Sequence, residues 1–296
     1  MNARAGSTRA LPAALERFSR PYPWERIDQA ARTAGGVIAQ GLLTPSDVAA
    51  LNLEIDEYLA EHGEEVAVPA TGSRAYDQFL GHKTLRLHGL LEKVPSSADL
   101  IGRPELIEWA ERLMAPVAES IQLNAGELIQ IQPGEPAQFV HRDCDSWPQI
   151  PLGQDPIIVN ALVALDACTL ENGATHIAPG SWRWEQGRRA DAHEFTRAVM
   201  DPGDAVLFRG DVIHRGGENA SNARRRILSI SYCVGWLRPV ENSFLNLSRK
   251  TVRALPQKLQ AVLGYAAYDA SMQRGGMIGL YENGDPGRAL RDSSAD

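Results

Sequence analysis

An imidazole and a carboxylate lie two residues apart in the segment 138–143, at His141 and Asp143. Residues i and i+2 of an extended chain point to the same face, so both side chains could bind one ion from one side of a strand. A second imidazole, His214, ends an apolar run further along the chain. Two histidines and one carboxylate with open coordination positions are the facial arrangement of non-haem Fe(II) oxygenases. The spacing alone is equally compatible with a buried, hydrogen-bonding histidine and an aspartate in a turn.

Three consecutive arginines, Arg224, Arg225 and Arg226, follow His214 and begin the next apolar run. A 2-oxo-dicarboxylate cosubstrate needs a cation at its far carboxylate, and a buried guanidinium meets a carboxylate with two parallel hydrogen bonds. One arginine of the three could do this, and the other two would then be solvated surface charges. The sequence alone does not select among them.

The composition limits the partners of the chain. Its 296 residues are 44% hydrophobic, and the net charge is −7. An acidic balance argues against nucleic acid or an anionic membrane as the main partner. No apolar run approaches the roughly 20 residues of a membrane-spanning helix, and no apolar signal core follows the first residues, so we expect a cytoplasmic location. The three cysteines show no C-x-x-C pairing, and we interpret them as small buried hydrophobes.

Helices and a few strands are expected in the first 120 residues. A short strand is predicted at 36–40. Thr44 is a good N-cap for a helix that starts at Pro45 and ends near 61–63. We interpret 64–82 as a loop, 83–91 as a strand, and 104–117 as a helix that packs against a sheet. Residues 1–25 and 287–296 are expected to be poorly ordered.

From residue 121 the pattern changes to short strands separated by turns with Pro or Gly, which is typical of a sandwich or jelly roll. We predict a jelly-roll core over 121–236 within a single domain, 1–296. The chain is thus expected to be mainly β with flanking helices and an N-terminal helical layer. Residues 246–265 are predicted to be helical, with Ser248 as a cap. The strands are expected at 128–132, 157–165, 205–208, 212–214 and 226–234.

Several motifs in this order resemble the phytanoyl-CoA dioxygenase family of Fe(II)/2-oxoglutarate oxygenases, which have a double-stranded β-helix core. The motifs are His141-Arg142-Asp143, Glu171-Asn172-Gly173-Ala174-Thr175, Pro179-Gly180-Ser181 and His214-x4-Asn219. Residues 235–242 and 263–265 further resemble one branch, which includes fungal meroterpenoid and indole-alkaloid oxygenases and bacterial relatives. The similarity covers roughly 37–265.

The resemblance implies roles for individual residues. Fe(II) would be bound by His141, Asp143 and His214. Asp145 shares the i+2 spacing and is the competing carboxylate, but the family pattern selects Asp143.

The cosubstrate 2-oxoglutarate would be bound by residues from four parts of the chain. Arg225 would pair with its C5 carboxylate, with Arg226 as the near alternative. Gln138, Thr175 and Arg86 would make further contacts. Thr175 could instead be a turn hydroxyl, and Arg86 a surface charge. A regular strand would turn Gln138 away from His141, so we expect the chain to bend between them.

The resemblance also implies the reaction. The chain would be a 2-oxoglutarate-dependent dioxygenase that oxidises, most simply hydroxylates, a small and largely apolar metabolite, while 2-oxoglutarate and O2 become succinate and CO2. The branch favours a terpenoid, polyketide, alkaloid or acyl-type substrate of secondary metabolism, and a homodimer. The alternative is a non-catalytic jelly-roll protein that binds small molecules and is stabilised by a metal. A Ser/His/Asp hydrolase is disfavoured because no G-x-S-x-G motif occurs.

Overall fold

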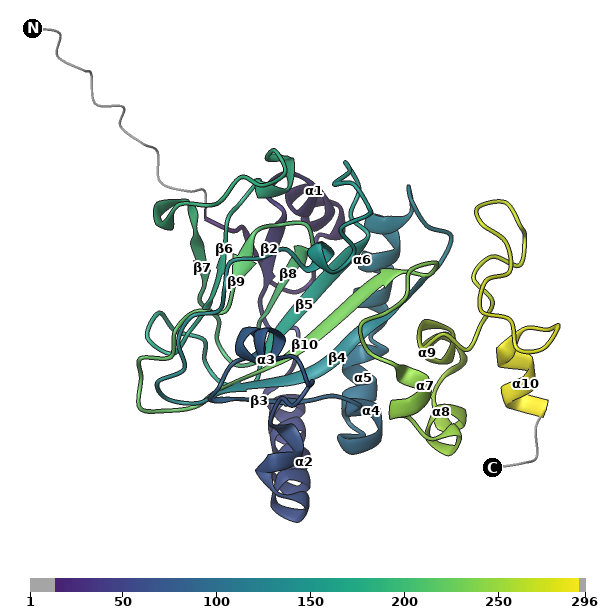
Figure 1. The fold of residues 1–296 in the computed structure, drawn as a ribbon, viewed down its shortest axis with the longest axis horizontal. Helices are drawn as coiled ribbons and strands as arrows, with labels where there is room; N and C mark the ends of the chain where they lie inside the picture. The colour runs from purple at the N-terminus through teal and green to yellow at the C-terminus, as the bar shows by residue number, and fades with distance from the viewer. Residues whose placement is uncertain (1–13, 293–296) are drawn as a thin grey trace, which may run out of the picture.

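The computed structural model describes residues 14–292, and two sheets form its centre (Figure 1). The larger sheet has seven strands in the order β1-β2-β8-β5-β10-β4-β3, and the smaller has the order β7-β6-β9. Only the pairing of β1 with β2 is parallel among the named strands. The bounds are β1 Arg17–Phe18, β2 Gly36–Ala39, β3 Thr84–Leu87, β4 Ile121–Ile131, β5 Ile158–Ala164, β6 Thr175–Ile177, β7 Thr196–Ala198, β8 Ala205–Arg209, β9 His214–Arg215 and β10 Arg225–Val234.

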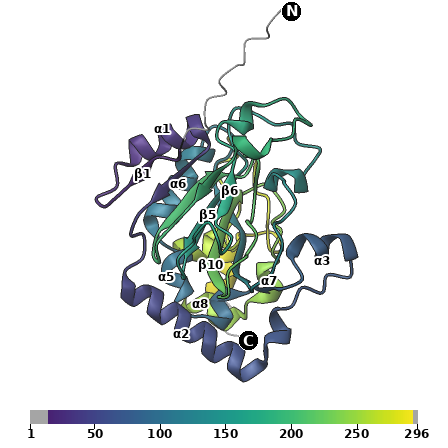
Figure 2. The same ribbon diagram turned by 90° about the vertical axis from the view of Figure 1, so that its left-hand side faces the viewer.

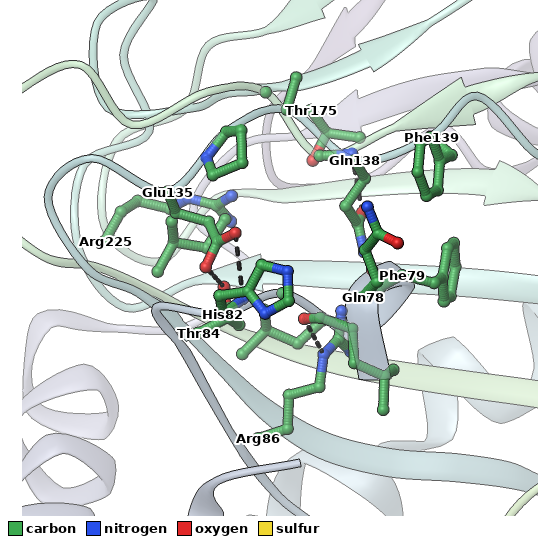
Figure 3. Close-up of a pocket in the computed structure, with 18 of the residues that line it drawn as sticks. Gln78, Phe79, His82, Thr84, Arg86, Glu135, Gln138, Phe139, Thr175 and Arg225 are labelled. Carbon is green, nitrogen blue, oxygen red and sulfur yellow. Dashed lines mark hydrogen bonds between the residues drawn. The ribbon is translucent and has the colours of Figure 1, made fainter. Parts of the chain in front are cut away.

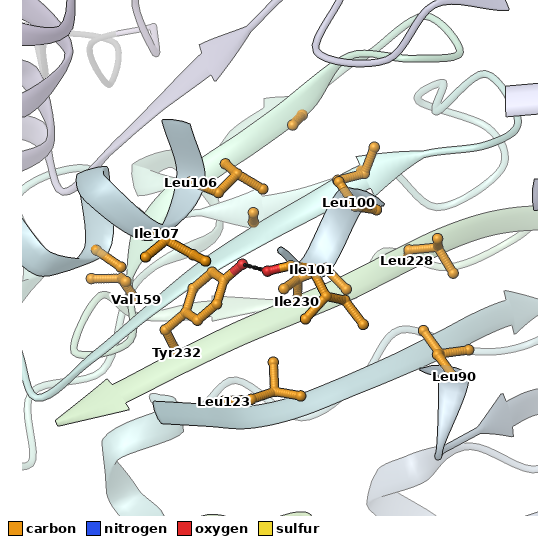
Figure 4. Close-up of a cluster of buried hydrophobic side chains, with 14 of the residues drawn as sticks. Leu90, Leu100, Ile101, Leu106, Ile107, Leu123, Val159, Leu228, Ile230 and Tyr232 are labelled. Atoms are coloured by element: carbon orange, nitrogen blue, oxygen red, sulfur yellow. Dashed lines mark hydrogen bonds between the residues drawn. The ribbon is translucent and has the colours of Figure 1, made fainter. Parts of the chain in front are cut away.

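The strand β10 shows how the two faces of the large sheet differ. Successive side chains alternate between faces. Leu228, Ile230 and Tyr232 belong to the main hydrophobic core, and the Tyr232 hydroxyl donates to the Ile101 carbonyl at 2.7 Å (Figure 4). The alternate positions, from Arg225 to Ser231, line cavities on the other face. One face therefore packs against helices, and the other is available for a site.

Helices cover the core face of the sheet. In Figure 2, α1, α2, α5 and α6 lie on one side, whereas α3 lies on the opposite side. Buried residues of these four helices join the same hydrophobic cluster as β5 and β10. The bounds are α1 Trp24–Ala34, α2 Pro45–His62, α3 Arg74–Leu80, α4 Leu90–Lys93, α5 Ser97–Ile101, α6 Pro104–Met114, α7 Ser243–Asn246, α8 Arg249–Ala254, α9 Gln257–Val262 and α10 Pro286–Asp292.

The start of α2 agrees with its sequence signals. The Thr44 hydroxyl accepts from the Asp47 amide, and the Asp47 carboxylate accepts from the Thr44 amide at 2.9 Å, so the two residues form a capping box. This satisfies two amide groups at the first turn that would otherwise lack partners. Pro45 occupies the first helical turn, where its missing amide hydrogen costs little. Val48, Leu51, Ile55 and Leu59 form the buried face.

Three expectations need correction. The segment 64–82 is not all loop, since it contains a 3₁₀ helix at Glu64–Ala67 and the helix α3. Residues 246–265 form α8 and α9 rather than one helix, because Pro256 cannot donate an amide and interrupts the helix. Within the regions expected to be poorly ordered, Arg17–Phe18 pairs with β2 and α10 covers 286–292. The rest of those regions, 1–13 and 293–296, lies outside the described residues.

One further expectation agrees with the structure. All three cysteines are free and buried. Among residues 14–292, no helix combines the length and the apolar character needed to cross a membrane.

Candidate metal centre and cosubstrate pocket

His141, Asp143 and His214 converge at one point. One potential ligand atom from each lies within 4.8 Å of the others. The Nε2 atoms of His141 and His214 are each 3.6 Å from Asp143 Oδ1. The structure thus brings together the three residues that the sequence pattern singled out. Asp145 is exposed, and its carboxylate accepts from the Arg142 amide at 3.0 Å, so it does not join this cluster.

The backbone places these ligands in an unexpected way. His141 does not lie in a long strand but forms an isolated antiparallel bridge with His214, with amide-to-carbonyl distances of 3.0 and 2.9 Å. Arg142 is extended, and Asp143 already begins a 3₁₀ helix at Asp143–Ser146. The buried Arg142 side chain donates to the carbonyls of Asp211 and Ser181, at 2.9 and 3.2 Å. Because Arg142 is extended, the side chains of His141 and Asp143 lie on one side of the chain. The Arg142 side chain lies on the other side, where its two hydrogen bonds hold the segment in place.

Hydrogen bonds around the cluster set the orientation of each ligand. The Nδ1 atoms of His141 and His214 lie 2.9 and 3.0 Å from the carbonyls of Phe139 and Val212. A carbonyl can only accept, so Nδ1 carries the proton and the Nε2 lone pair is directed at the centre. The Asn160 amide donates to Asp143 Oδ2 at 2.7 Å, which leaves Oδ1 for a metal.

The pKa values of the ligands favour metal binding. Burial lowers the pKa of His214 to about 4, so its imidazole is neutral at pH 7. Burial by itself would raise the pKa of Asp143, but the two imidazoles and the Asn160 amide outweigh this and lower it. Metal ligands must be deprotonated, and both groups meet this condition near neutral pH. Two imidazoles and one carboxylate form a donor set that fits Fe(II).

Arg225 lies in a cavity of about 260 Å³ beside the metal cluster (Figure 3). Its side chain is buried, and Nη2 donates to the Gly173 carbonyl at 2.9 Å. Its Nε and Nη1 atoms have no hydrogen-bond partner among the described residues. Burial lowers the pKa of this guanidinium, and two unpaired buried donors are costly unless a ligand meets them. A carboxylate fits both the charge and the paired donors.

The neighbouring arginines point elsewhere. Arg226 donates through Nη1 to Asn52 and through Nη2 to Asp56, at 3.1 and 2.6 Å, on the face covered by α2. Arg224 also pairs with Asp56, at 3.4 Å. Among the three consecutive arginines, Arg225 is therefore the one with donors available to a ligand.

The other residues expected to contact 2-oxoglutarate all line the Arg225 cavity. Thr175 is buried in β6. The chain forms no strand between β4 and His141, in keeping with the expected bend, and the Gln138 carbonyl oxygen Oε1 accepts from the Gly216 amide at 2.9 Å. Arg86 also faces the cavity, but its Nη1 donates to both carboxylate oxygens of Glu127 at 2.9 Å. Arg86 thus lines the cavity while it is paired with the Glu127 carboxylate.

A second cavity of about 430 Å³ contains the metal cluster itself. It shares a wall with the Arg225 cavity, formed by side chains from α3, β3, β4 and the segment before His141. The shared residues are Phe79, Leu80, Arg86, Ile129 and Gln138. The metal cluster therefore lies in the larger cavity, directly next to the cavity with the unpaired arginine.

Sequence reasoning missed three residues at this site. Asn160 was overlooked because the run 157–165 was interpreted as a continuous apolar strand. A single amide side chain inside a buried strand is nevertheless a signal for a functional contact. Glu127 lies just before the predicted strand 128–132 and was not assigned to it, whereas the strand β4 begins at Ile121. Phe79, from α3, stacks edge-on against His141 with ring centroids 4.7 Å apart. It was missed because 64–82 lacks a helical period.

The fold and the site together define the class. Antiparallel sheets that hold a His/Asp/His cluster next to a buried arginine with unpaired donors are typical of a 2-oxoglutarate-dependent oxygenase with a jelly-roll core. The sequence model of the phytanoyl-CoA dioxygenase (PhyH) family matches residues 31–227, and the chain belongs to this family.

Relatives and solved structures agree with this assignment. Dioxygenase swnH1 of Metarhizium robertsii is 30% identical over 297 residues, covering 94% of this chain and 92% of the relative. Dioxygenase FrzG of a Cladobotryum species is 32% identical over 278 residues, with 85% and 88% covered. The carbocyclase SnoK from nogalamycin biosynthesis, described as non-heme and alpha-ketoglutarate dependent, has a TM-score of 0.58 at 19% identity, covering 76% of this chain and 90% of SnoK.

The epimerase SnoN, solved with Fe3+, alpha-ketoglutarate and nogalamycin RO, has a TM-score of 0.56 at 19% identity, with 75% of this chain and 88% of SnoN covered. At these identities the two structures establish the fold, and they confirm the expected jelly-roll core.

Proposed function

We propose that this chain is an Fe(II)/2-oxoglutarate-dependent dioxygenase that hydroxylates a small, largely apolar metabolite. The observation that carries the proposal is the pair of adjoining cavities, one with the His/Asp/His cluster and one with the buried, unpaired Arg225. The dioxygenase names of the relatives support it. With Fe(II) and 2-oxoglutarate bound, the site would supply oxidation of a substrate C–H bond while 2-oxoglutarate and O2 become succinate and CO2.

The residues of the chain have distinct tasks in this proposal. His141, Asp143 and His214 would hold Fe(II), and Asn160 fixes the orientation of the Asp143 carboxylate. Arg225 would neutralise the C5 carboxylate of 2-oxoglutarate, while Gln138, Thr175 and Arg86 line the same cavity. Two aromatic rings cover the histidines, with centroid distances of 4.7 Å for Phe79 to His141 and 4.9 Å for Phe208 to His214. These rings would limit the access of water to one side of each histidine, which would strengthen charge interactions there.

The names of the relatives support a proposal for the substrate class. The chain resembles dioxygenases from fungi and solved structures from nogalamycin biosynthesis, so we propose a secondary metabolite of terpenoid, polyketide, alkaloid or acyl type as the substrate. We further propose a homodimer, as the resemblance of 235–242 and 263–265 to one branch implies. Exposed apolar side chains at Phe244, Leu245 and Leu280 are consistent with it. Light scattering on the purified protein would decide between one and two copies.

The test uses the purified protein loaded anaerobically with Fe(II). We expect 2-oxoglutarate to be converted to succinate once O2 is admitted, slowly alone and faster with metabolite extract. His214→Ala should abolish this conversion, whereas Glu108→Gln, at an exposed position on α6, should retain it. Metal-dependent stabilisation without any succinate would instead support the non-catalytic binding protein.

A further inference from the structure

The inner face of the large sheet forms a wall, with several polar side chains, of the cavity that contains His141, Asp143 and His214. Two rows of paired residues run across β4, β10 and β5: Glu127, Ser229 and Leu162 in one, and Ala125, Ser231 and Asn160 in the next. All six residues line the 430 Å³ cavity. Asn160 at the end of the second row contacts the metal ligand Asp143, at 2.7 Å. Glu127 lies on β4, two strand spacings from β5, which is roughly 10 Å.

The Glu127 carboxylate retains unused hydrogen-bond acceptor positions. Its carboxylate is 13% exposed and accepts from Arg86 Nη1 at 2.9 Å through both oxygens. Glu127 Oε2 also lies 3.5 Å from His88 Nε2. A carboxylate has about four acceptor positions, so Arg86 and His88 still leave some of them for a ligand. Arg86 also balances the negative charge, which lowers the cost of keeping this carboxylate in a partly enclosed cavity.

Ser229 provides a second polar group in the same row. Among the described residues its hydroxyl has no hydrogen-bond partner, and its backbone lies between Glu127 on β4 and Leu162 on β5. An unengaged hydroxyl beside a carboxylate can both donate to and accept from a bound group. Glu127 and Ser229 can therefore bind a ligand, because their hydrogen-bonding groups are not all used within the protein.

A β-bulge shapes the neighbouring row. The register of β4 against β10 shifts between Ser231 and Tyr232, which leaves Asn124 as the extra residue of β4. Its amide donates to Ser231 Oγ at 3.1 Å, and its carbonyl oxygen accepts from the Val240 amide at 3.0 Å. Bulges next to active sites re-aim side chains, and here the polar groups of Asn124 are used within the protein. This leaves Glu127 and Ser229 as the polar groups of the wall open to a substrate.

The opposite side of the cavity is apolar. The side chains of Tyr76, Phe79 and Leu80 from α3 line it. Leu162 and Phe208 add apolar surface on the sheet, and the Phe208 ring lies 4.9 Å from that of His214. A substrate bound here would place hydrocarbon against α3 and near the metal, and a polar group against the sheet.

We propose that Glu127 and Ser229 bind an O–H or N–H donor of the substrate, so that the enzyme selects small molecules that carry a hydroxyl or an amine at the end remote from the oxidised carbon. This inference rests on the proposed dioxygenase function and makes its substrate class more specific. Glu127 is then a specificity-determining residue, because it touches the substrate rather than the metal.

The test measures binding of matched probes to the full-length protein loaded with Mn(II) and 2-oxoglutarate. Three probes share one bicyclic skeleton: 2-decalol, 2-aminodecalin and 2-methoxydecalin, whose ether retains an acceptor but has no donor. Paramagnetic relaxation of the probe signals by Mn(II) reports both affinity and orientation. We expect the alcohol, the amine or both to bind about 10- to 100-fold more tightly than the ether, as for a hydrogen bond to a charged group. Relaxation should be weakest at the polar end.

Variants separate recognition from folding. Glu127→Gln and Ser229→Ala should each reduce the preference over the ether, and Ser229→Ala leaves the Arg86–Glu127 pair intact. Glu108→Gln is the matched exposed control and should keep the preference. The inference is overturned if the ether binds as well as both donors, if no probe binds, or if the preference survives in both variants. Succinate formation by the Fe(II)-loaded wild type is measured in parallel, because its loss would count against the dioxygenase function instead.

Discussion

Arg225 and Arg226 are neighbours in β10 and point to opposite faces of the sheet. Arg225 has two unpaired donors in the cavity next to the metal cluster, whereas Arg226 is bound by Asn52, Asp56 and Gln130 on the helix-covered face. Strand alternation produces this division. Arg225 is thus available to bind a ligand, whereas Arg226 contributes to the stability of the fold.

Replacing each arginine separately should separate these tasks. Arg225→Gln should weaken 2-oxoglutarate binding about 10- to 100-fold, because a charged hydrogen-bonding partner of the C5 carboxylate is lost. Arg226→Gln should leave this affinity nearly unchanged and lower the free energy of unfolding by about 1–3 kcal/mol. Calorimetric titration of the Mn(II)-loaded proteins and urea unfolding measure the two effects. A larger loss of cosubstrate affinity in the Arg226 variant would refute the assignment.

Asn160 should control metal affinity without being a ligand. Asn160→Ala removes the amide that holds Asp143 Oδ2, and groups of this kind change metal affinity by about 10- to 100-fold. Mn(II) binding followed by electron paramagnetic resonance measures the change. Gln29→Ala, which removes an exposed amide on α1, serves as the control. Equal affinity in the wild type and the Asn160 variant would show that Asp143 is oriented by other contacts.

Gly173 should support Arg225 through its backbone. It has φ +93°, and an added Cβ would lie 2.6 Å from the Gly217 carbonyl oxygen. Its own carbonyl accepts from Arg225 Nη2. Gly173→Ala should therefore destabilise the fold by about 1–3 kcal/mol and weaken 2-oxoglutarate binding. Gly187 has φ +87° with open space around it, so Gly187→Ala tests the backbone strain alone and should spare cosubstrate binding.

His176 should make stability depend on pH. Burial, together with Arg197 and Arg215, lowers its pKa to about 4, while the unfolded chain has an ordinary value near 6.5. Between these values the unfolded state binds more protons, so the free energy of unfolding decreases as the pH falls from about 6.5 to about 4. His176→Gln removes this contribution. The difference between the two proteins in urea midpoint should therefore change between pH 7.5 and pH 4.5, and parallel curves would contradict the expectation.

The sequence predicted the candidate metal ligands because their positions follow from short-range rules. His141 and Asp143 needed only one extended residue between them, and His214 followed a clear apolar run. The capping box at Thr44 and Asp47 is equally local, and it is present as expected. The family resemblance added the jelly-roll connection between these local signals.

Other features depended on packing that the sequence does not show. Strand alternation separates Arg225 from Arg226, but which of them faces the cavity depends on where α2 packs. Glu127 and Asn160 occupy inner-face positions that become recognisable only when the register of β4, β10 and β5 is known. The helix α3 is short, and its role as a cavity wall comes from tertiary contacts of Phe79 with the metal ligand His141.

Isotope labelling tests the dioxygenase function most directly. The Fe(II)-loaded protein is supplied with 2-oxoglutarate under ¹⁸O₂, and the succinate is analysed by mass spectrometry. We predict one ¹⁸O atom in each succinate molecule, with formation lost in His214→Ala. Succinate without the label, or no succinate even with metabolite extract present, would contradict the dioxygenase function.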